Sequence, residues 1–266
     1  MSFALGSFLH TLPLTALAVV VLLAITFAAA LIYHKHAVID VAWGLGFALI
    51  AIVTLVASAG HGDPARRWLI TALTVLWGVR LAVHIGWRGR RHGEDPRYDK
   101  LLSRAKGNRD AYALRSVYLV QGVAMWFVSL PVQVTQFSAG GLGIVAWVGA
   151  AIWLVGFFFE AVGDLQLVRF KARPANKGVV MTEGLWRYTR HPNYFGDACV
   201  WWGLFLIAAD AWPGALTVLS PLIMTYFLAR GTGKRVLEKH MRDRPGFADY
   251  VERTSGFFPL PPRKTT

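Results

Sequence analysis

The chain has 266 residues, of which 55% are hydrophobic, and its mean hydropathy of +0.43 is too high for an ordinary soluble domain. Its net charge is +13, but the basic residues flank apolar segments and no nucleic-acid-binding motif occurs, so nucleic acid is not an expected partner. The single cysteine, Cys199, lies in an apolar segment, which excludes a disulfide framework and a cysteine metal cluster.

Apolar runs long enough to cross a bilayer recur along the chain. Because these runs are uninterrupted instead of alternating, they predict helices and exclude a β-barrel. We therefore expect an all-α, polytopic membrane protein with six or seven transmembrane helices, in which the last two spans could instead form one re-entrant pair. The expected spans are residues 11–33, 38–59, 67–87, 115–137, 141–163, 196–210 and 212–229.

The basic residues gather on one side of these spans. Of the 28 Lys and Arg residues, 24 lie in three regions, which are residues 88–115, 169–190 and 230–266. The segments near Ser138 and Asp210 hold none, and only Arg66 and Arg67 depart from the bias. Basic residues favour the cytoplasmic side, so we expect the amino terminus outside and the carboxyl terminus in the cytoplasm.

The second span begins with an acid, Asp40, and an acid near or within a membrane is costly and usually functional. The alternative is an interfacial Asp that caps the start of the helix. At the end of the first span, His34 and His36 do not face one another on a helix, so no metal site is expected there.

In the third span, Arg80, His84 and Arg88 recur every four residues and form one polar stripe, which allows either a catalytic role for Arg80 or a buried ion pair with an acid such as Asp40. The fourth span is apolar except for two glutamines, Gln121 and Gln133, and we assign it no chemistry.

The fifth span carries a polar stripe of Glu160, Asp164 and Lys171 near its end. Two acids four residues apart can bind a metal, bond the hydroxyls of a ribose, or balance the neighbouring arginines. Because no His shares this stripe, metal binding is the least favoured of the three. After the last span, Arg230 and Lys234 form a further stripe with Glu238.

The segment from Gly184 to Asp197 concentrates charged and polar residues between two apolar spans. Pro192 can begin a helix, which would place Asn193 and Asp197 on one face. The amino end of this helix, together with Arg190 and His191, would favour a bound anion. Two glycine-rich strings, at residues 141–146 and 231–234, lack the context of nucleotide-binding motifs, so no Rossmann domain is expected.

Five motifs give the chain a family resemblance. They are residues 40–44 (DVAWG), 77–81 (WGVRL), 94–98 (EDPRY), 184–196 and 250–259. Through them the chain resembles the bacterial branch of the steroid 5-alpha-reductase family, a DUF1295-type branch of a superfamily of membrane reductases and methyltransferases. The motif at 184–196 is typical of the whole superfamily, and the motifs around it narrow the resemblance to this branch.

The resemblance implies one integral membrane domain over residues 1–266, a multi-pass protein of the bacterial inner membrane. It implies that NADPH binds to cytoplasmic loops 88–114, 169–195 and 230–266, and that an apolar, steroid-like or isoprenoid lipid is reduced at a conjugated carbon–carbon double bond. Residue patterns and resemblance together assign catalytic roles to Asp40 and Arg80. They assign cofactor contacts to Tyr33, Arg88, Arg90, Tyr98, Asp164, Lys171, Arg190, His191, Asn193, Tyr194, Asp197, Arg230 and Lys234.

The chain departs from the animal steroid reductases, which polarise the substrate ketone with an adjacent Gln-Glu and a Tyr. It has Ile39 and Asp40 at the first position, and Trp77 where the Tyr would stand. We expect Asp40, as a protonated acid in apolar surroundings, to polarise the enone oxygen. The high Arg content favours NADPH over NADH.

Two alternatives remain at this stage. An S-adenosylmethionine-dependent lipid methyltransferase of the same superfamily would usually carry two adjacent Glu after the last span, where this chain has only Glu238 among bases. A non-enzymatic membrane protein is the other alternative, and the small number of polar residues within the spans disfavours a transport pathway.

Overall fold

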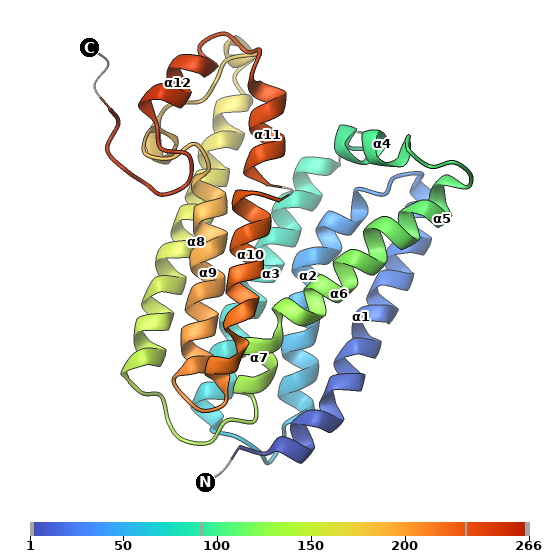
Figure 1. Cartoon of the computed structure of the whole chain (residues 1–266), viewed down its shortest axis with the longest axis vertical. Helices are drawn as coiled ribbons and strands as arrows, with labels where there is room; N and C mark the ends of the chain where they lie inside the picture. Colours follow the sequence, from blue (N-terminus) through green and yellow to red (C-terminus); the bar gives the residue numbers. More distant parts are fainter. Residues whose placement is uncertain (1–2, 91–92, 232, 264–266) are drawn as a thin grey trace. The chain divides into compact units, whose positions relative to one another are not determined.

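The computed structural model describes residues 3–90, 93–231 and 233–263, and within these ranges the chain forms helices and no strand (Figure 1). Five helices are long and apolar enough to cross a membrane. They are Leu5–Tyr33 (α1), Val38–Ala57 (α2), Pro64–Gly89 (α3), Arg109–Thr135 and Ile144–Lys171 (α8). The prediction of an all-α, polytopic membrane protein is confirmed.

The fourth long helix is built from four consecutive segments: Arg109–Ala113 (α5), the π-helical turn Leu114–Tyr118 (η1), Leu119–Val128 (α6) and Leu130–Thr135 (α7). It begins before the predicted residue 115 because the side chain of Asn108 accepts a hydrogen bond from the backbone N–H of Ala111 and so caps the helix. Its last segment begins at Leu130, next to Pro131, whose backbone nitrogen has no hydrogen to donate to the preceding turn.

The predicted sixth and seventh spans correspond to Pro192–Ala209 (α9) and to the 3₁₀ turn Gly214–Val218 (η4) with Leu219–Ala229 (α10). Both are shorter than the five long helices. The number of crossings and the orientation in the membrane stay predictions. The remaining elements are Pro96–Leu102 (α4), Pro174–Asn176 (η2), Gly184–Arg187 (η3), Lys234–Met241 (α11) and Phe247–Arg253 (α12).

The chain divides into two compact units. The first comprises Met1–Ile144 and Ile207–Thr217, and the second comprises Val145–Leu206 and Val218–Thr266. The predicted loop 88–114 therefore belongs to the first unit, while the predicted loops 169–195 and 230–266 belong to the second. The expected organisation as one integral domain over residues 1–266 stays a prediction.

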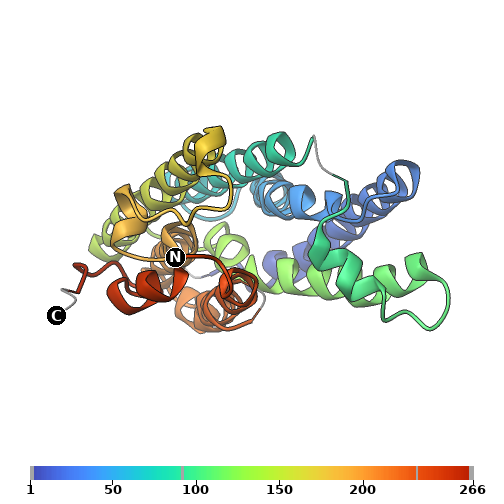
Figure 2. The same cartoon turned by 90° about the horizontal axis from the view of Figure 1, so that it is seen from above.

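In the first unit, α2 packs against α1 on one side and α3 on the other, as the view from above shows (Figure 2). The α2–α3 crossing is tight because glycines meet there. A Cβ at Gly44 would overlap the carbonyl oxygen of Gly78, and a Cβ at Gly78 would overlap that of Gly44. Small residues at such crossings let helix backbones approach closely in a membrane.

A Gly44→Ala substitution should therefore destabilise the first unit by about 1–3 kcal/mol, because the new methyl group meets backbone atoms that cannot rotate away. The thermal unfolding midpoint in detergent measures this effect. Gly6→Ala in α1 is the matched control, since nothing lies within 4 Å of its added Cβ. Equal midpoints for the two variants would contradict the tight crossing.

Arg66, which departed from the charge bias, is a buried structural residue of the first unit with 1% of its surface exposed. Its guanidinium donates to the carboxylate of Asp210 at 2.5 Å and to the carbonyl oxygens of Ile207 and Gly141, each at 2.7 Å. A buried and fully bonded arginine contributes little to the charge of a loop, so it does not oppose the predicted orientation.

In the second unit, α8 and α9 pack through glycines spaced by seven residues. A Cβ at Gly156 would lie 2.5 Å from the carbonyl oxygen of Gly196, and a Cβ at Gly203 would lie 2.6 Å from that of Gly149. After α10, the carboxyl-terminal segment folds back onto the motif at 184–196, next to the start of α9. The hydroxyl of Tyr250 donates to the carbonyl oxygen of Trp186, whose indole N–H donates to Gly163 of α8.

Candidate functional site

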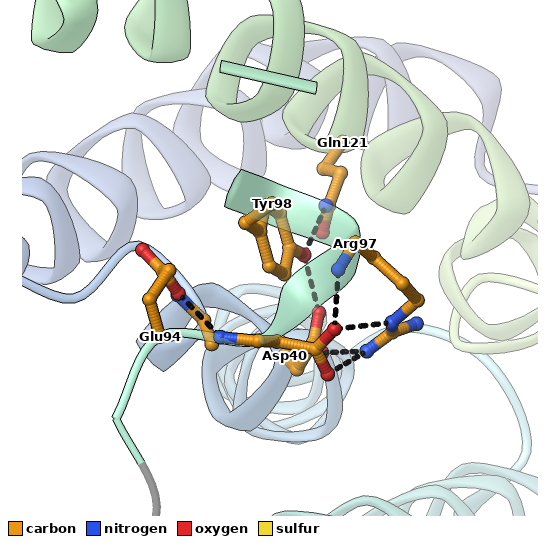
Figure 3. Close-up of polar contacts among 7 residues, drawn as sticks. Asp40, Glu94, Arg97, Tyr98 and Gln121 are labelled. Carbon is orange, nitrogen blue, oxygen red and sulfur yellow. Dashed lines mark hydrogen bonds and ion pairs between the residues drawn. The ribbon is translucent and has the colours of Figure 1, made fainter. Parts of the chain in front are cut away.

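Asp40, in the first turn of α2, lies at the centre of a polar cluster of the first unit (Figure 3). The phenol of Tyr98 donates to its Oδ1 at 2.5 Å, and the guanidinium of Arg97 donates to its Oδ2 at 2.8 Å. The side-chain amide of Gln121, from α6, donates to the Tyr98 hydroxyl at 3.3 Å. Both carboxylate oxygens of Asp40 therefore accept hydrogen bonds.

The motif at 94–98 explains why Arg97 and Tyr98 reach Asp40. Asp95 caps α4, because its side chain accepts a hydrogen bond from the backbone N–H of Arg97 at 2.8 Å, and Pro96 occupies the first helical position. Glu94 accepts from the backbone N–H groups of His36 at 2.6 Å and Ala37 at 2.9 Å. The motif thus caps two helices: Glu94 binds the backbone at the start of α2, and the next residue, Asp95, caps α4.

Electrostatics keep the donors of this cluster protonated. Burial, the charge of Asp40 and the hydrogen bond to it raise the pKa of Tyr98 above its ordinary value. Burial disfavours the charged form of Arg97, but its hydrogen bond to Asp95 and the nearby carboxylates outweigh this and raise its pKa. Burial likewise opposes the charge of Asp95, but the hydrogen bonds and charge of Arg97 lower the pKa of that carboxyl. Tyr98 is therefore a phenol and Arg97 a cation at physiological pH.

Sequence reasoning assigned no role to two members of the cluster, Arg97 and Gln121. Arg97 stood within the motif at 94–98, and Gln121 stood in the fourth apolar span. Gln121 was one of two glutamines in that span, to which no chemistry was assigned, and a lone amide there was the only available signal. A π-helical turn lies directly before α6, and such turns often occur at functional sites. The same turn places Tyr118, with 1% of its surface exposed, beside His36.

The other predicted residues of the first unit lie on α1 and α3. Tyr33 is 72% exposed at the end of α1, and Arg80 is partly buried on α3. Arg88 is exposed near the end of α3, and its charge helps to lower the pKa of Asp95, so it lies near the cluster. Arg90 is exposed directly after α3. The structure thus brings Asp40, Tyr98 and Arg88 to one region of the first unit.

A second cluster, in the second unit, joins the motif at 184–196 to α11. Oε1 of Glu238 accepts from Nε of Arg190 at 2.9 Å and lies 3.0 Å from Nε2 of His191. Arg190, 8% exposed, also donates through Nη1 to the carbonyl oxygens of Val251 and Thr254. Most of the hydrogen bonds of Arg190 therefore hold the carboxyl-terminal segment in place.

Next to this cluster, the first turn of α9 carries several of the predicted cofactor residues. The ring of His191 stacks on that of Tyr194, with an angle of 4° between the planes. The amide of Asn193 donates to the carboxylate of Asp164 on α8 at 3.3 Å. Asp197 is partly buried one turn further along α9. The predicted common face of Asn193 and Asp197 thus exists on a real helix, and Asp164 faces its start.

The remaining predicted residues of the second unit are cations at helix ends. Lys171 is exposed at the end of α8, Arg230 is exposed directly after α10, and Lys234 is half-buried at the start of α11. Among the described residues, no group of three or more His, Cys, Asp or Glu side chains is arranged to hold a metal ion.

The pKa values of the second cluster shift in the same direction. Burial lowers the pKa of His191 below 6.5, although its hydrogen bond to Glu238 opposes this. Burial would raise the pKa of Glu238, but hydrogen bonds from His191 and Arg190 outweigh it and lower the value to about 2. At neutral pH the cluster is therefore a neutral imidazole, a carboxylate and a guanidinium.

This cluster should make the protein less stable in acid. Both groups bind protons more readily in the unfolded chain, so the free energy of unfolding falls as the pH drops, first below 6.5 through His191 and then from 4.5 toward about 2 through Glu238. Thermal midpoints measured between pH 8 and about pH 2 should show this decline. In a Glu238→Gln variant the decline below pH 4.5 should be smaller, and an unchanged profile would contradict the assignment.

Comparison with known proteins places the chain in a family. The model of a family described as a protein of unknown function (DUF1295) matches residues 26–254. The chain belongs to this family. A relative within curated proteins, an uncharacterized protein of the fission yeast Schizosaccharomyces pombe, is 22% identical over 249 residues, covering 83% of this chain and 72% of the relative. No solved structure matches the chain. The family match includes both clusters, from Asp40 to Glu238.

Proposed function

We propose that this DUF1295 protein is a membrane-embedded, NADPH-dependent reductase of a carbon–carbon double bond in an apolar enone, steroid-like or isoprenoid. The observation that carries the proposal is the cluster of Asp40, Arg97 and Tyr98, which combines a protonated phenol and a cation with a carboxylate at the start of an apolar helix. The resemblance of its motifs to steroid 5-alpha-reductases adds support.

The chemistry of enone reduction needs hydrogen-bond donors at the ketone oxygen. As the β-carbon gains a hydride, negative charge develops on that oxygen, and prearranged donors stabilise it. The Tyr98 phenol becomes such a donor when its single O–H turns from Asp40 to the substrate oxygen, and Arg97 adds a positive charge beside it. Because both oxygens of Asp40 already accept hydrogen bonds, its role in this mechanism is to position Tyr98 and Arg97, and Tyr98 takes over the donation first predicted for Asp40.

The residues of the second unit fit an anionic dinucleotide. Lys234 is half-buried at the start of α11, and Lys171 and Arg230 are exposed. Asn193 and Asp164 offer an amide and a carboxylate to the amide or hydroxyl groups of such a ligand. When bound, NADPH supplies the hydride, and these residues hold and orient it.

The methyltransferase alternative gains no support from this geometry. The single acid after α10, Glu238, already accepts from Arg190 and lies against His191, whereas a sulfonium ligand calls for carboxylates directed at the ligand. Cations around it also disfavour a positively charged cofactor.

A thermal-shift titration of the detergent-purified protein tests the proposal. A ligand that binds only the folded state raises the unfolding midpoint once its concentration exceeds its dissociation constant. NADPH should raise the midpoint, while S-adenosylmethionine and S-adenosylhomocysteine should not. A shift with the adenosylmethionine pair alone would replace the proposal with the methyltransferase. No shift with any of the four ligands, NADH included, in protein whose absorbance spectrum shows no co-purified cofactor would leave the non-enzymatic alternative.

A further inference from the structure

The carboxyl-terminal segment that follows α12 is held in place by hydrogen bonds to the motif at 184–196 (Figure 1). The backbone N–H of Leu260 donates to the carbonyl oxygen of Tyr188 at 3.0 Å. The hydroxyl of Thr189 donates to the carbonyl oxygen of Phe257 at 2.9 Å. The segment is therefore ordered through its backbone, and this order does not require that its apolar side chains be buried.

Three apolar side chains of this pair of segments are in fact exposed. Phe258 is 64% exposed and Leu260 is 54% exposed, and Tyr188, which is bonded to Leu260 through the backbone, is 43% exposed. We call these three residues the apolar edge. Neighbouring apolar side chains that are fixed on a surface in this way usually mark a place that another molecule or a membrane covers.

Ring contacts connect the apolar edge with the membrane-spanning helix α8. The ring centroid of Phe258 lies 6.1 Å from that of Phe195 in the first turn of α9, and the centroid of Phe195 lies 5.1 Å from that of Phe159 on α8. Phe158, the neighbour of Phe159, is 52% exposed on this apolar helix. The predicted span 141–163 ends only about 6 Å beyond Phe159 along the helix axis. The apolar edge therefore lies close to the level at which α8 leaves the hydrocarbon.

Basic side chains stand beside the apolar edge. The backbone N–H of Arg263 donates to the carbonyl oxygen of Arg253 at 2.9 Å, so these two exposed arginines lie near each other in the same segment as Phe258. Arg187, next to the edge in the other segment, is also exposed. Basic residues close to a membrane surface attract anionic lipid headgroups, so the charge beside the edge matches such a surface.

We propose that the apolar edge is an interfacial anchor that binds anionic lipid. Phe258 and Leu260 enter the boundary between headgroups and acyl chains, and Arg253 and Arg263 bind the headgroups. Aromatic and aliphatic side chains beside bases are the combination that binds at this depth. Because the same segment is bonded to the motif at 184–196, the anchor links the lipid surface to the second cluster. This inference does not rest on the proposed reductase function.

Spin labelling of the full-length protein in lipid nanodiscs tests the depth of the edge. Cys199→Ala removes the single cysteine, and Leu260→Cys then carries a nitroxide at an exposed position. Oxygen, which concentrates in hydrocarbon, and a nickel chelate, which stays in water, together report the depth of the label. Phe158→Cys on α8 is the membrane reference, and Asp243→Cys, exposed in the turn between α11 and α12, is the water reference.

In discs of phosphatidylcholine with phosphatidylglycerol, we expect the Leu260 label to lie about 5–10 Å inside the level of the lipid phosphates. In phosphatidylcholine alone the label should move toward water, because the arginines lose their anionic partners. The double variant Arg253→Gln, Arg263→Gln should show no difference between the two lipids. Arg242→Gln, Arg244→Gln is the matched control, since it removes the same charge at exposed positions of the same unit and should keep the difference.

The anchor is overturned if the Leu260 label is as accessible to the nickel chelate as the Asp243 label in both lipids. Equal depth of the Leu260 label in the two lipids would overturn the role of anionic headgroups. Protection that occurs only in discs with two copies of the chain would assign the edge to a second copy and would also overturn the lipid anchor. NADPH takes no part in these measurements, so the anchor and the reductase can fail independently.

Discussion

A Tyr98→Phe variant should lose about 10²- to 10⁴-fold in turnover of NADPH with a conjugated enone, the range typical of a removed proton donor. The ring still fills its buried place, but the hydrogen bond to Asp40 and the donor to the developing oxygen charge are gone. NADPH oxidation with a panel of steroid-like and isoprenoid enones measures the loss. The NADPH-induced thermal shift should stay at the wild-type value, because Tyr98 polarises the substrate in this mechanism.

Tyr112→Phe is the matched control, since its hydroxyl makes no hydrogen bond with the described residues and it lies on α5, near the same core. Asp40→Asn should also abolish turnover while it spares NADPH binding, because an amide holds Arg97 poorly. The double variant Asp40→Asn, Tyr98→Phe should be no slower than the worse single variant, as residues that act as a unit are not additive. Full turnover in Tyr98→Phe would remove Tyr98 from the mechanism.

The second large effect, on the free energy of unfolding, is expected from replacing Glu238. Replacing it by Ala leaves the buried guanidinium of Arg190 and the imidazole of His191 without their shared acceptor. Breaking a buried ion pair costs about 3–5 kcal/mol, and because the Glu238 side chain is 22% exposed, we expect about 2–4 kcal/mol. The unfolding midpoint measures the cost, and limited trypsin digestion should cut between α11 and the end of α12 earlier than in the wild type.

Glu252→Ala, at an exposed position of α12, is the control and should change neither the midpoint nor the digestion pattern. If Glu238→Ala matches this control, the contacts of Arg190 with Val251 and Thr254 would be sufficient to hold the carboxyl-terminal segment without the carboxylate.

The helices could be predicted from the sequence because length and apolar composition alone decide whether a segment can cross a bilayer. The same criterion left the sixth and seventh spans open. The 18 residues of α9 are close to the minimum length that can cross a bilayer. The ends of a helix depend on single side chains. The fourth long helix begins at Arg109 and not at the predicted residue 115, because the side chain of Asn108 caps it. Composition does not contain this information.

Part of the candidate site was predictable in its residues, but its contacts were not. Asp40 and Tyr98 were both singled out, but they are 58 positions apart, and their meeting depends on the cap at Asp95. Arg190 was assigned to the cofactor because arginine suits phosphates. The structure shows that backbone carbonyl oxygens and Glu238 take most of its donors, and carbonyl partners leave no trace in the sequence.

The cap that Glu94 provides for α2 has a consequence for biosynthesis. The backbone groups of His36 leave the ribosome 58 residues before the carboxylate that binds them. At about 5–20 residues per second, this delay lasts roughly 3–12 s. During that time α1 and α2 enter the translocon with an open helix end and with Asp40 still lacking Arg97 and Tyr98. The emergence of residues 94–98 is therefore the earliest moment at which α2 gains its cap and Asp40 its two donors.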